Sequence, residues 1–127
     1  TIPDIVGIWD CGDFESDGTI KETSVLEFSY TGGTGGRVTH THVSGTNQLI
    51  YETSNGSWNI SDDGTISLSF SEGVNSVHPY WKGKGYGGTF DDLFFPLKIT
   101  GTVDWWYAGS SGGESHGYYN FVMTRRT

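Results

Sequence analysis

Two histidines lie two residues apart, His40 and His42, in the segment RVTHTHVS at 37–44. In an extended strand the side chains at i and i+2 point to the same face, so both imidazoles can serve one ligand or one proton-transfer site. They share this parity with Val38, which predicts that both rings point into the core. No glutamate follows the pair within a few residues, and a metal site is therefore not expected.

Carboxylates are the second group that could carry acid–base chemistry. Asp104 precedes Trp105 directly, and a partly buried acid against an indole tends to have a raised pKa. No spacing singles out a pair among the acids on or near expected strands, which are Asp10, Asp13, Glu27, Glu52 and Asp104. The catalytic candidates are therefore His40, His42 and Asp104.

Aromatic residues are abundant, with five tryptophans, seven tyrosines and seven phenylalanines. Trp and Tyr combine a large contact area with a hydrogen-bonding tip, which suits the wall of a ligand cavity. The alternative is that these rings simply fill the core. The candidate ligand-binding residues are Phe28, His40, His42, Tyr51, Trp58, Trp81, Trp105, Tyr107 and Tyr119.

Length and charge narrow the class of protein. The 127 residues indicate one domain, spanning 1–127, and the single cysteine, Cys11, allows no intrachain disulfide. A net charge of −8 argues against nucleic acid as a partner, and no apolar run reaches the length of a membrane span. No motif predicts a cofactor, and the expected partner is a small molecule. Localisation and oligomeric state stay open.

The pattern of residues predicts an all-β chain. Twenty glycines punctuate aromatic and β-branched runs, and Ile66, Leu68 and Phe70 alternate cleanly with polar residues. Strands are expected at 7–14, 23–30, 37–44, 49–54, 57–61, 65–70 and 118–126, with one or two more within 94–109. The segment 76–88 mixes glycines with Pro79 and predicts an irregular strand or a long loop. About eight strands at hairpin spacing favour a single antiparallel up-and-down barrel, because closure removes exposed edges.

One set of these residues resembles the lipocalin-like branch of the calycin superfamily. In that superfamily a Gly-x-Trp on the first strand packs against a basic residue from the last strand, and avidin-like barrels share the pair. The resemblance implies a lipocalin-like barrel in which Trp9 contacts Arg125 or Arg126. The residues that carry it are Gly7, Trp9, Gly56, Trp58, Ile60, Gly64, Thr65, Leu68 and one of the two arginines.

Three functions are compatible with such a barrel. The first is binding of an apolar or aromatic compound in an aromatic-lined cavity. The second is a small barrel enzyme, a cyclase, isomerase or lyase, that uses an internal histidine or carboxylate for acid–base catalysis. The third is carbohydrate binding through exposed rings in 76–88 and 105–107. An internal polar pair near a cavity would favour the enzyme, a wholly apolar cavity the carrier, and coplanar surface tryptophans the lectin.

Two glycine-rich loops bear on where a ligand enters. The loops at 31–36 and 110–113 carry no large apolar anchor, which predicts mobile and poorly packed backbone. If Gly101 is only a bulge within one long strand, the barrel has eight strands and these loops lie at opposite ends. We place the mouth at the end that carries 110–113, because the aromatic run Trp105 to Tyr107 leads into it.

Overall fold

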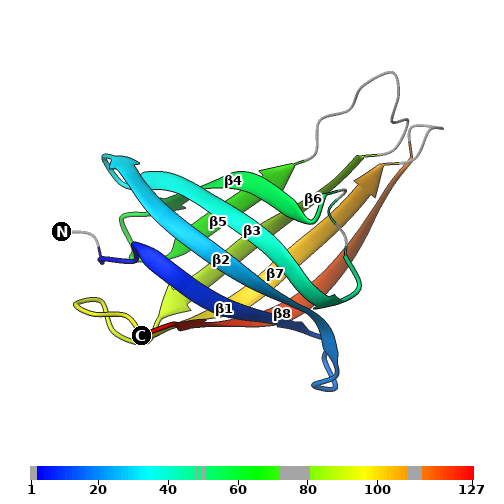
Figure 1. The fold of residues 1–127 in the computed structure, drawn as a ribbon, viewed down its shortest axis with the longest axis horizontal. Helices are drawn as coiled ribbons and strands as arrows, with labels where there is room; N and C mark the ends of the chain where they lie inside the picture. The colour runs from blue at the N-terminus through cyan, green and yellow to red at the C-terminus, as the bar shows by residue number, and fades with distance from the viewer. Residues whose placement is uncertain (1–2, 48, 50, 72–80, 109–112) are drawn as a thin grey trace.

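The computed structural model describes residues 3–47, 49, 51–71, 81–108 and 113–127. Eight antiparallel strands, paired in chain order, close into a single up-and-down barrel, and the described residues form no helix (Figure 1). The strands are β1 Gly7–Phe14, β2 Ile20–Gly32, β3 Gly35–Gly45, β4 Thr53–Ile60, β5 Ile66–Ser71, β6 Trp81–Phe90, β7 Lys98–Ala108 and β8 Glu114–Arg125. The predicted fold class is confirmed.

Pairing of the first strand with the last closes the barrel. Trp9 lies opposite Arg125 in the β1–β8 register, and the guanidinium carbon lies 4.9 Å from the centroid of the indole. The Arg125 Nε also donates to the carbonyl oxygen of Pro96 at 3.0 Å. Arg126 instead extends outward and pairs with Asp10. The predicted contact between Trp9 and a terminal arginine is confirmed, with Arg125 as the partner.

The two ends of the barrel differ in what they carry. One end, here the terminal end, holds both chain termini and the connections 33–34, 61–65 and 91–97 (Figure 1). The other, here the polar end, holds the connections 15–19 and 46–52. At the terminal end the segment before β1 folds back, so that the Trp9 indole donates to the carbonyl oxygen of Ile5 at 3.0 Å.

The core fills the barrel with side chains from all eight strands. Phe28 lies edge-on to both Trp9 and Trp58, while Tyr86 lies edge-on to both Phe70 and Phe121. The buried hydrophobic residues are Ile5, Trp9, Cys11, Leu26, Phe28, Val38, Leu49, Trp58, Ile60, Ile66, Leu68, Phe70, Tyr86, Ile99, Val103, Trp105, Phe121 and Met123.

The strand β6 corrects one expectation. The segment 76–88 is expected to be an irregular strand or a long loop; its residues 76–80 lie outside the described residues, but Trp81–Phe90 pairs regularly with both neighbouring strands. The glycines of β6 make room for the Trp106 ring, which lies across the strand. A Cβ on Gly83 would come within 2.3 Å of this ring. An aromatic ring that covers a strand glycine replaces the missing side-chain packing.

Two further boundaries differ from the prediction. The expected break around 54–56 lies inside β4, and Leu49, Tyr51 and Glu52 lie before this strand rather than in it. The register of β7 runs unbroken through Gly101, so this residue marks neither a bulge nor a turn. A Cβ there would lie 2.0 Å from the Gly87 carbonyl oxygen, which explains the glycine by close backbone approach.

The loop at 31–36 is shorter and better packed than expected. β2 and β3 extend through it and leave only residues 33–34 between them. A Cβ on Gly36 would lie 2.0 Å from the Ser29 carbonyl oxygen and 2.8 Å from the Trp58 indole nitrogen. The prediction of poor packing is therefore wrong for Gly35 and Gly36, whereas residues 31–34 are exposed. Residues 110–112 lie outside the described residues. The order of the eight strands nevertheless confirms that the connection between β2 and β3 and the connection between β7 and β8 belong to opposite ends of the barrel.

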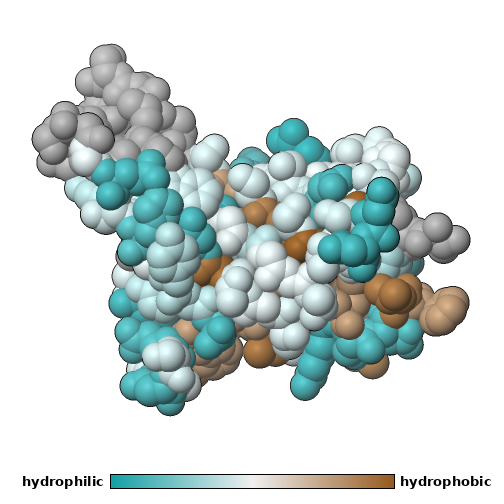
Figure 2. Space-filling model, turned by 180° about the vertical axis from the view of Figure 1, so that it is seen from behind, coloured by the Kyte–Doolittle hydropathy of each residue, from teal (hydrophilic) through white to brown (hydrophobic). Residues whose placement is uncertain are grey.

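On the face shown in Figure 2, hydrophobic residues gather at the terminal end, where the connection between β6 and β7 lies. Within it Phe94 is 93% exposed, and Leu93, Phe95 and Leu97 are also exposed. Across the part of the chain that the structure describes, no helix is long and apolar enough to cross a membrane.

Candidate functional site

A cluster of charged side chains lies inside the barrel near its polar end. Its centre is the ammonium of Lys84, on the inner face of β6, whose side chain has no exposed surface. The Lys84 Nζ lies 3.0 Å from an Asp13 oxygen and also contacts Glu22. It lies 3.1 Å from the Tyr86 hydroxyl and 3.4 Å from His40 Nε2. Side chains from β1, β2, β3 and β6 thus meet at one buried cation.

The Asp13 carboxylate contacts several further side chains of this charged cluster. One of its oxygens accepts from the Trp105 indole at 3.0 Å, and the Tyr86 hydroxyl lies within 3.3 Å of both oxygens. The Sγ atom of Cys11 is 3.5 Å away. Burial, followed by the charge of Asp13, raises the pKa of the Cys11 thiol well above its ordinary value. Burial likewise raises the pKa of Tyr86. Both groups therefore stay protonated beside the carboxylate.

Glu22 connects the charged cluster to His42, near the polar end of the barrel. Its Oε2 lies 2.7 Å from Nδ1 of His42, and its Oε1 lies 3.4 Å from Nε2 of His40. Burial alone would raise the pKa of Glu22, but the hydrogen bond with His40 and the charge of Lys84 outweigh it and lower the pKa to about 2. Glu22 is therefore ionised at neutral pH.

Both predicted histidines point inward. His40 is fully buried, and the side chain of His42 is only 13% exposed. The His40 Nδ1 is buried without a hydrogen-bond partner among the described residues, while its ring packs edge-on to Phe70. Buried polar atoms nearly always have a partner, so this nitrogen marks a point that a water or a polar ligand atom can satisfy. The prediction of inward histidines is confirmed.

An aromatic pocket of about 210 Å³ opens beside the charged cluster, between the polar ends of β7 and β8. Trp105 belongs to both, because it faces the pocket while its indole donates to Asp13. The Tyr119 ring lies 4.6 Å from the Trp105 ring, centroid to centroid. The pocket is lined by Trp105, Trp106, Tyr107, Ser115, His116, Gly117 and Tyr119.

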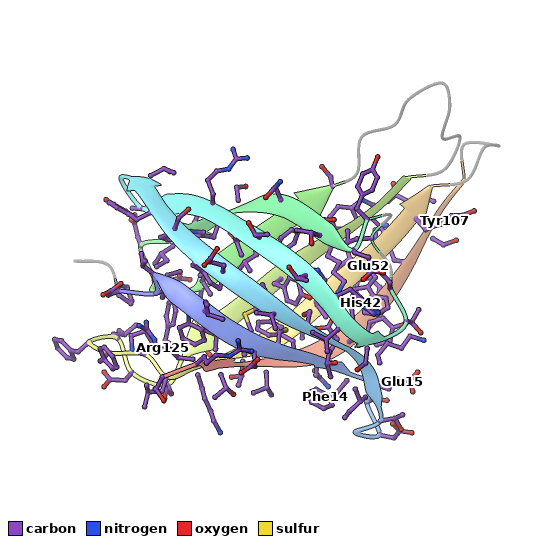
Figure 3. All side chains as sticks on the ribbon, viewed as in Figure 1. Phe14, Glu15, His42, Glu52, Tyr107 and Arg125 are labelled. Carbon is purple, nitrogen blue, oxygen red and sulfur yellow. The ribbon has the colours of Figure 1, made fainter. Side chains whose placement is uncertain are left out.

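The predicted ligand-binding residues do not all lie at the same end of the barrel. His40, His42, Trp105, Tyr107 and Tyr119 gather at the polar end, and Figure 3 shows His42 and Tyr107 toward this end and Arg125 at the other.

The four other candidates lie elsewhere or have no described side chain. Phe28 and Trp58 pack against each other in the terminal half, where the Trp58 indole donates to the Ser29 carbonyl oxygen. Tyr51 is 55% exposed on the connection 46–52. Trp81 begins β6, but its side chain lies outside the described residues.

Asp104 lies on the outer face of β7, away from the charged cluster. Its oxygens lie 2.8 and 3.0 Å from Nδ1 of His116, whose Nε2 lies 2.5 Å from Glu114. The hydrogen bonds to Asp104 and then Glu114 raise the pKa of His116. Asp104 was a candidate for an internal site, but its side chain points outward. Strand alternation imposes this orientation because the neighbouring Trp105 points inward.

Sequence reasoning missed Glu22 and Lys84. Glu22 falls just before the expected start of the second strand, and Lys84 falls in the glycine-rich segment expected to be irregular. The signal for Lys84 was present, since Lys84 and Tyr86 alternate with Gly83, Gly85 and Gly87 at period two.

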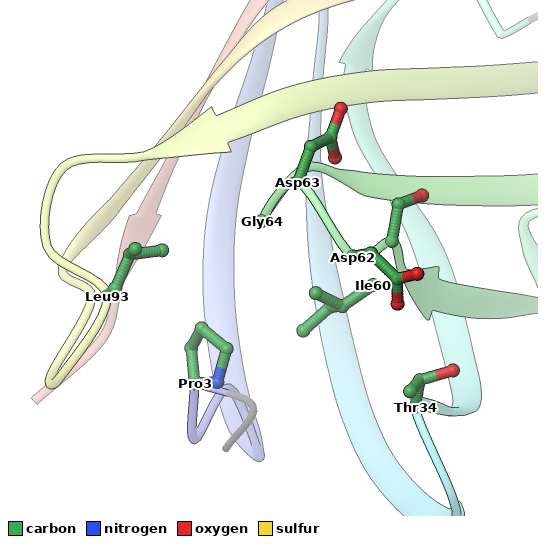
Figure 4. A pocket seen from close by; sticks show the side chains of 8 residues that line it. Pro3, Thr34, Ile60, Asp62, Asp63, Gly64 and Leu93 are labelled. Carbon is green, nitrogen blue, oxygen red and sulfur yellow. The ribbon is translucent and has the colours of Figure 1, made fainter.

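A second pocket, of about 350 Å³, lies at the terminal end (Figure 4). It is lined by Pro3, Thr34, Ile60, Ser61, Asp62, Asp63, Gly64 and Leu93. Its carboxylates lie on the turn before β5, where Asp63 accepts from the backbone and the hydroxyl of Thr65. The charged cluster is therefore far from this pocket and belongs to the opposite end. No group of three or more histidine, cysteine or acidic residues in the described ranges is arranged to hold a metal ion.

The closed eight-stranded antiparallel barrel is consistent with a calycin-like fold. No model of a known protein family matches the chain, and neither does any curated protein.

Proposed function

We propose that the chain is a lipocalin-like barrel that binds one small molecule at its polar end, in the aromatic pocket beside the charged cluster. The observation that carries this proposal is the double role of Trp105. Its ring lines the pocket, while its indole nitrogen is held by Asp13 at 3.0 Å. An anchored aromatic wall loses little freedom on binding, and such pre-organisation favours affinity.

Filling of the barrel centre supports a site at the end rather than in the middle. The edge-on contacts of Phe28 with Trp9 and Trp58, and of Tyr86 with Phe70 and Phe121, occupy the interior. The aromatic pocket, by contrast, offers about 210 Å³. A compact planar compound with a polar edge fits its chemistry, with rings against Tyr119 and Trp105 and the polar edge toward the charged cluster.

Titration with 2-naphthol, a neutral planar aromatic, tests this assignment through the change in its fluorescence. Trp105→Phe should weaken binding at least tenfold, and Tyr107→Ala should weaken it as well. The matched control is Trp58→Phe, which also removes an indole hydrogen bond, but in the terminal half of the barrel. Deletion of glycines within 31–36 provides a second control at that end. Equal effects at both ends, or none at either, would contradict the proposed site.

An acid–base enzyme on the same scaffold is the second candidate, and the charged cluster favours it. Burial of an ion costs several kcal/mol, and a hydrophobic replacement for a buried ion pair is often as stable or more so. The terminal half of this barrel is packed with apolar side chains, so filling the core does not by itself require Lys84, Asp13 and Glu22. An enzyme would accelerate proton removal from a carbon acid, whereas a carrier would not.

Carbohydrate binding finds no comparable support. Trp105 and Trp106 point to opposite faces of β7, and Trp9 and Trp58 are buried. Among the tryptophans whose side chains are described, no exposed coplanar pair is present.

A further inference from the structure

The pair formed by Glu22 and His42 has the geometry of a carboxylate that orients an imidazole. The Nδ1–Oε2 distance is 2.7 Å, Glu22 has no exposed side-chain surface, and His42 is 13% exposed. β2 and β3 fix the two side chains relative to each other, since His42 lies opposite Ser24 in the register. The carboxylate is therefore buried, and part of the imidazole is accessible to solvent.

The charge state of Glu22 fixes which nitrogen of His42 carries a proton. Contacts with Lys84 and His40 keep the carboxylate ionised, and an ionised carboxylate only accepts hydrogen bonds. The Nδ1 atom of His42 must therefore be the donor. In neutral imidazole the other nitrogen, Nε2, then holds a lone pair. Within the described part of the chain, Nε2 of His42 makes no hydrogen bond.

The other titratable groups of the charged cluster are already committed. Lys84 has three acceptors for its three protons, on Asp13, Glu22 and Tyr86, and Asp13 accepts hydrogen bonds from Lys84, Tyr86 and Trp105. His40 is fully buried. His42 is the member that combines a fixed orientation, a ring nitrogen without a partner among the described residues, and partial access.

We propose that Glu22 and His42 form a proton-transfer dyad, in which Nε2 of His42 removes a proton from a weakly acidic carbon of a planar molecule bound at the polar end. The proposal rests on the proposed binding site, which would hold that molecule against Trp105. His42 is the catalytic base. Glu22 is a positioning residue, and Lys84 keeps its carboxylate charged.

The carbon acid 5-nitrobenzisoxazole is a suitable probe because its reaction needs only a base. Nε2 of His42 takes the ring proton, and the electrons of the broken C–H bond form the third bond of a nitrile. The N–O bond breaks, and its oxygen leaves as the nitrophenolate, which absorbs visible light. Water then accepts the proton from His42. The reaction consumes no oxidant, reductant or cofactor.

Four variants separate catalysis from folding. His42→Gly should lower kcat about 100-fold, in the range that general-base catalysis supplies, and added imidazole should restore part of the rate. Thr41→Gly, on the outer face of the same strand, should leave kcat within twofold. Glu22→Gln should lower kcat, whereas Glu27→Gln on the outer face of β2 should not. A wild-type rate no greater than that of free imidazole at equal concentration, or an unchanged kcat in His42→Gly, would overturn the dyad.

Nitrogen-15 NMR of the histidine rings tests the dyad without turnover and without a variant. The wild type should show His42 with Nδ1 protonated and Nε2 bare, and Glu22→Gln should lose this preference. A protonated Nε2 in the wild type at neutral pH would overturn the proposal.

The kinetic constants also separate the dyad from the binding site. If the site is wrong, Trp105→Phe will leave KM for the probe unchanged while His42→Gly still lowers kcat. If the dyad is wrong, Trp105→Phe will raise KM while His42→Gly leaves kcat unchanged.

Discussion

Replacement of Lys84 by methionine is expected to be among the most destabilising single changes in the barrel. The ammonium lies 3.0 Å from Asp13, contacts Glu22 and has no exposed surface. Methionine fills a similar volume but leaves two buried carboxylates without their cation. Removal of one partner of a buried ion pair costs about 3–5 kcal/mol. Urea denaturation has a slope of roughly 1–3 kcal/mol per molar, so the midpoint should fall by about 2 M.

Two controls isolate the buried charge as the cause. Lys98→Met, at an exposed position on β7, should change the free energy of unfolding by less than about 0.5 kcal/mol. The triple variant Asp13→Asn, Glu22→Gln, Lys84→Met removes all three charges and should recover much of the loss, because no unpaired carboxylate remains. A loss below about 1 kcal/mol in Lys84→Met, or no recovery in the triple variant, would refute this reasoning.

Three further outcomes follow from the same contacts. Because the pKa of Glu22 is lowered from 4.5 to about 2, its stabilisation should be complete above pH 4.5 and fade as the pH falls toward 2. The difference in unfolding free energy between wild type and Glu22→Gln across that range should change by on the order of 3 kcal/mol. Burial and the raised pKa of Cys11 predict no reaction with a thiol reagent until the chain unfolds, and rapid labelling of the native protein would contradict this. Trp9→Ala should cost about 3–5 kcal/mol by chemical denaturation, since it removes a fully buried ring and the stacking surface of Arg125, and a cost near zero would contradict that role.

Local patterns in the sequence were sufficient to predict the barrel. The alternation of Ile66, Leu68 and Phe70 identifies an inner face, and closure through Trp9 and Arg125 appears as predicted. The inward direction of His40 follows from its parity with Val38, because side chains alternate along a strand.

The charged cluster could not be predicted from local sequence patterns, because its members are far apart in the chain. Asp13 and Lys84 lie 71 residues apart in the chain, and only closure of the barrel brings them together. Lys84 was hidden because glycines surround it in the sequence, and those glycines are explained by a ring from the next strand, Trp106. Likewise, parity assigns Asp104 to the outer face as soon as Trp105 is inside, so the choice between these neighbours required the register of β7.

The native mass spectrum of the protein purified from its own source tests the central claim most directly. The native mass is expected to exceed the mass of the denatured chain by one small molecule. The same molecule should rebind to the wild type and to Trp58→Phe, but not to Trp105→Phe. Identical native and denatured masses, or equal rebinding to all three proteins, would contradict a ligand site at the polar end of the barrel.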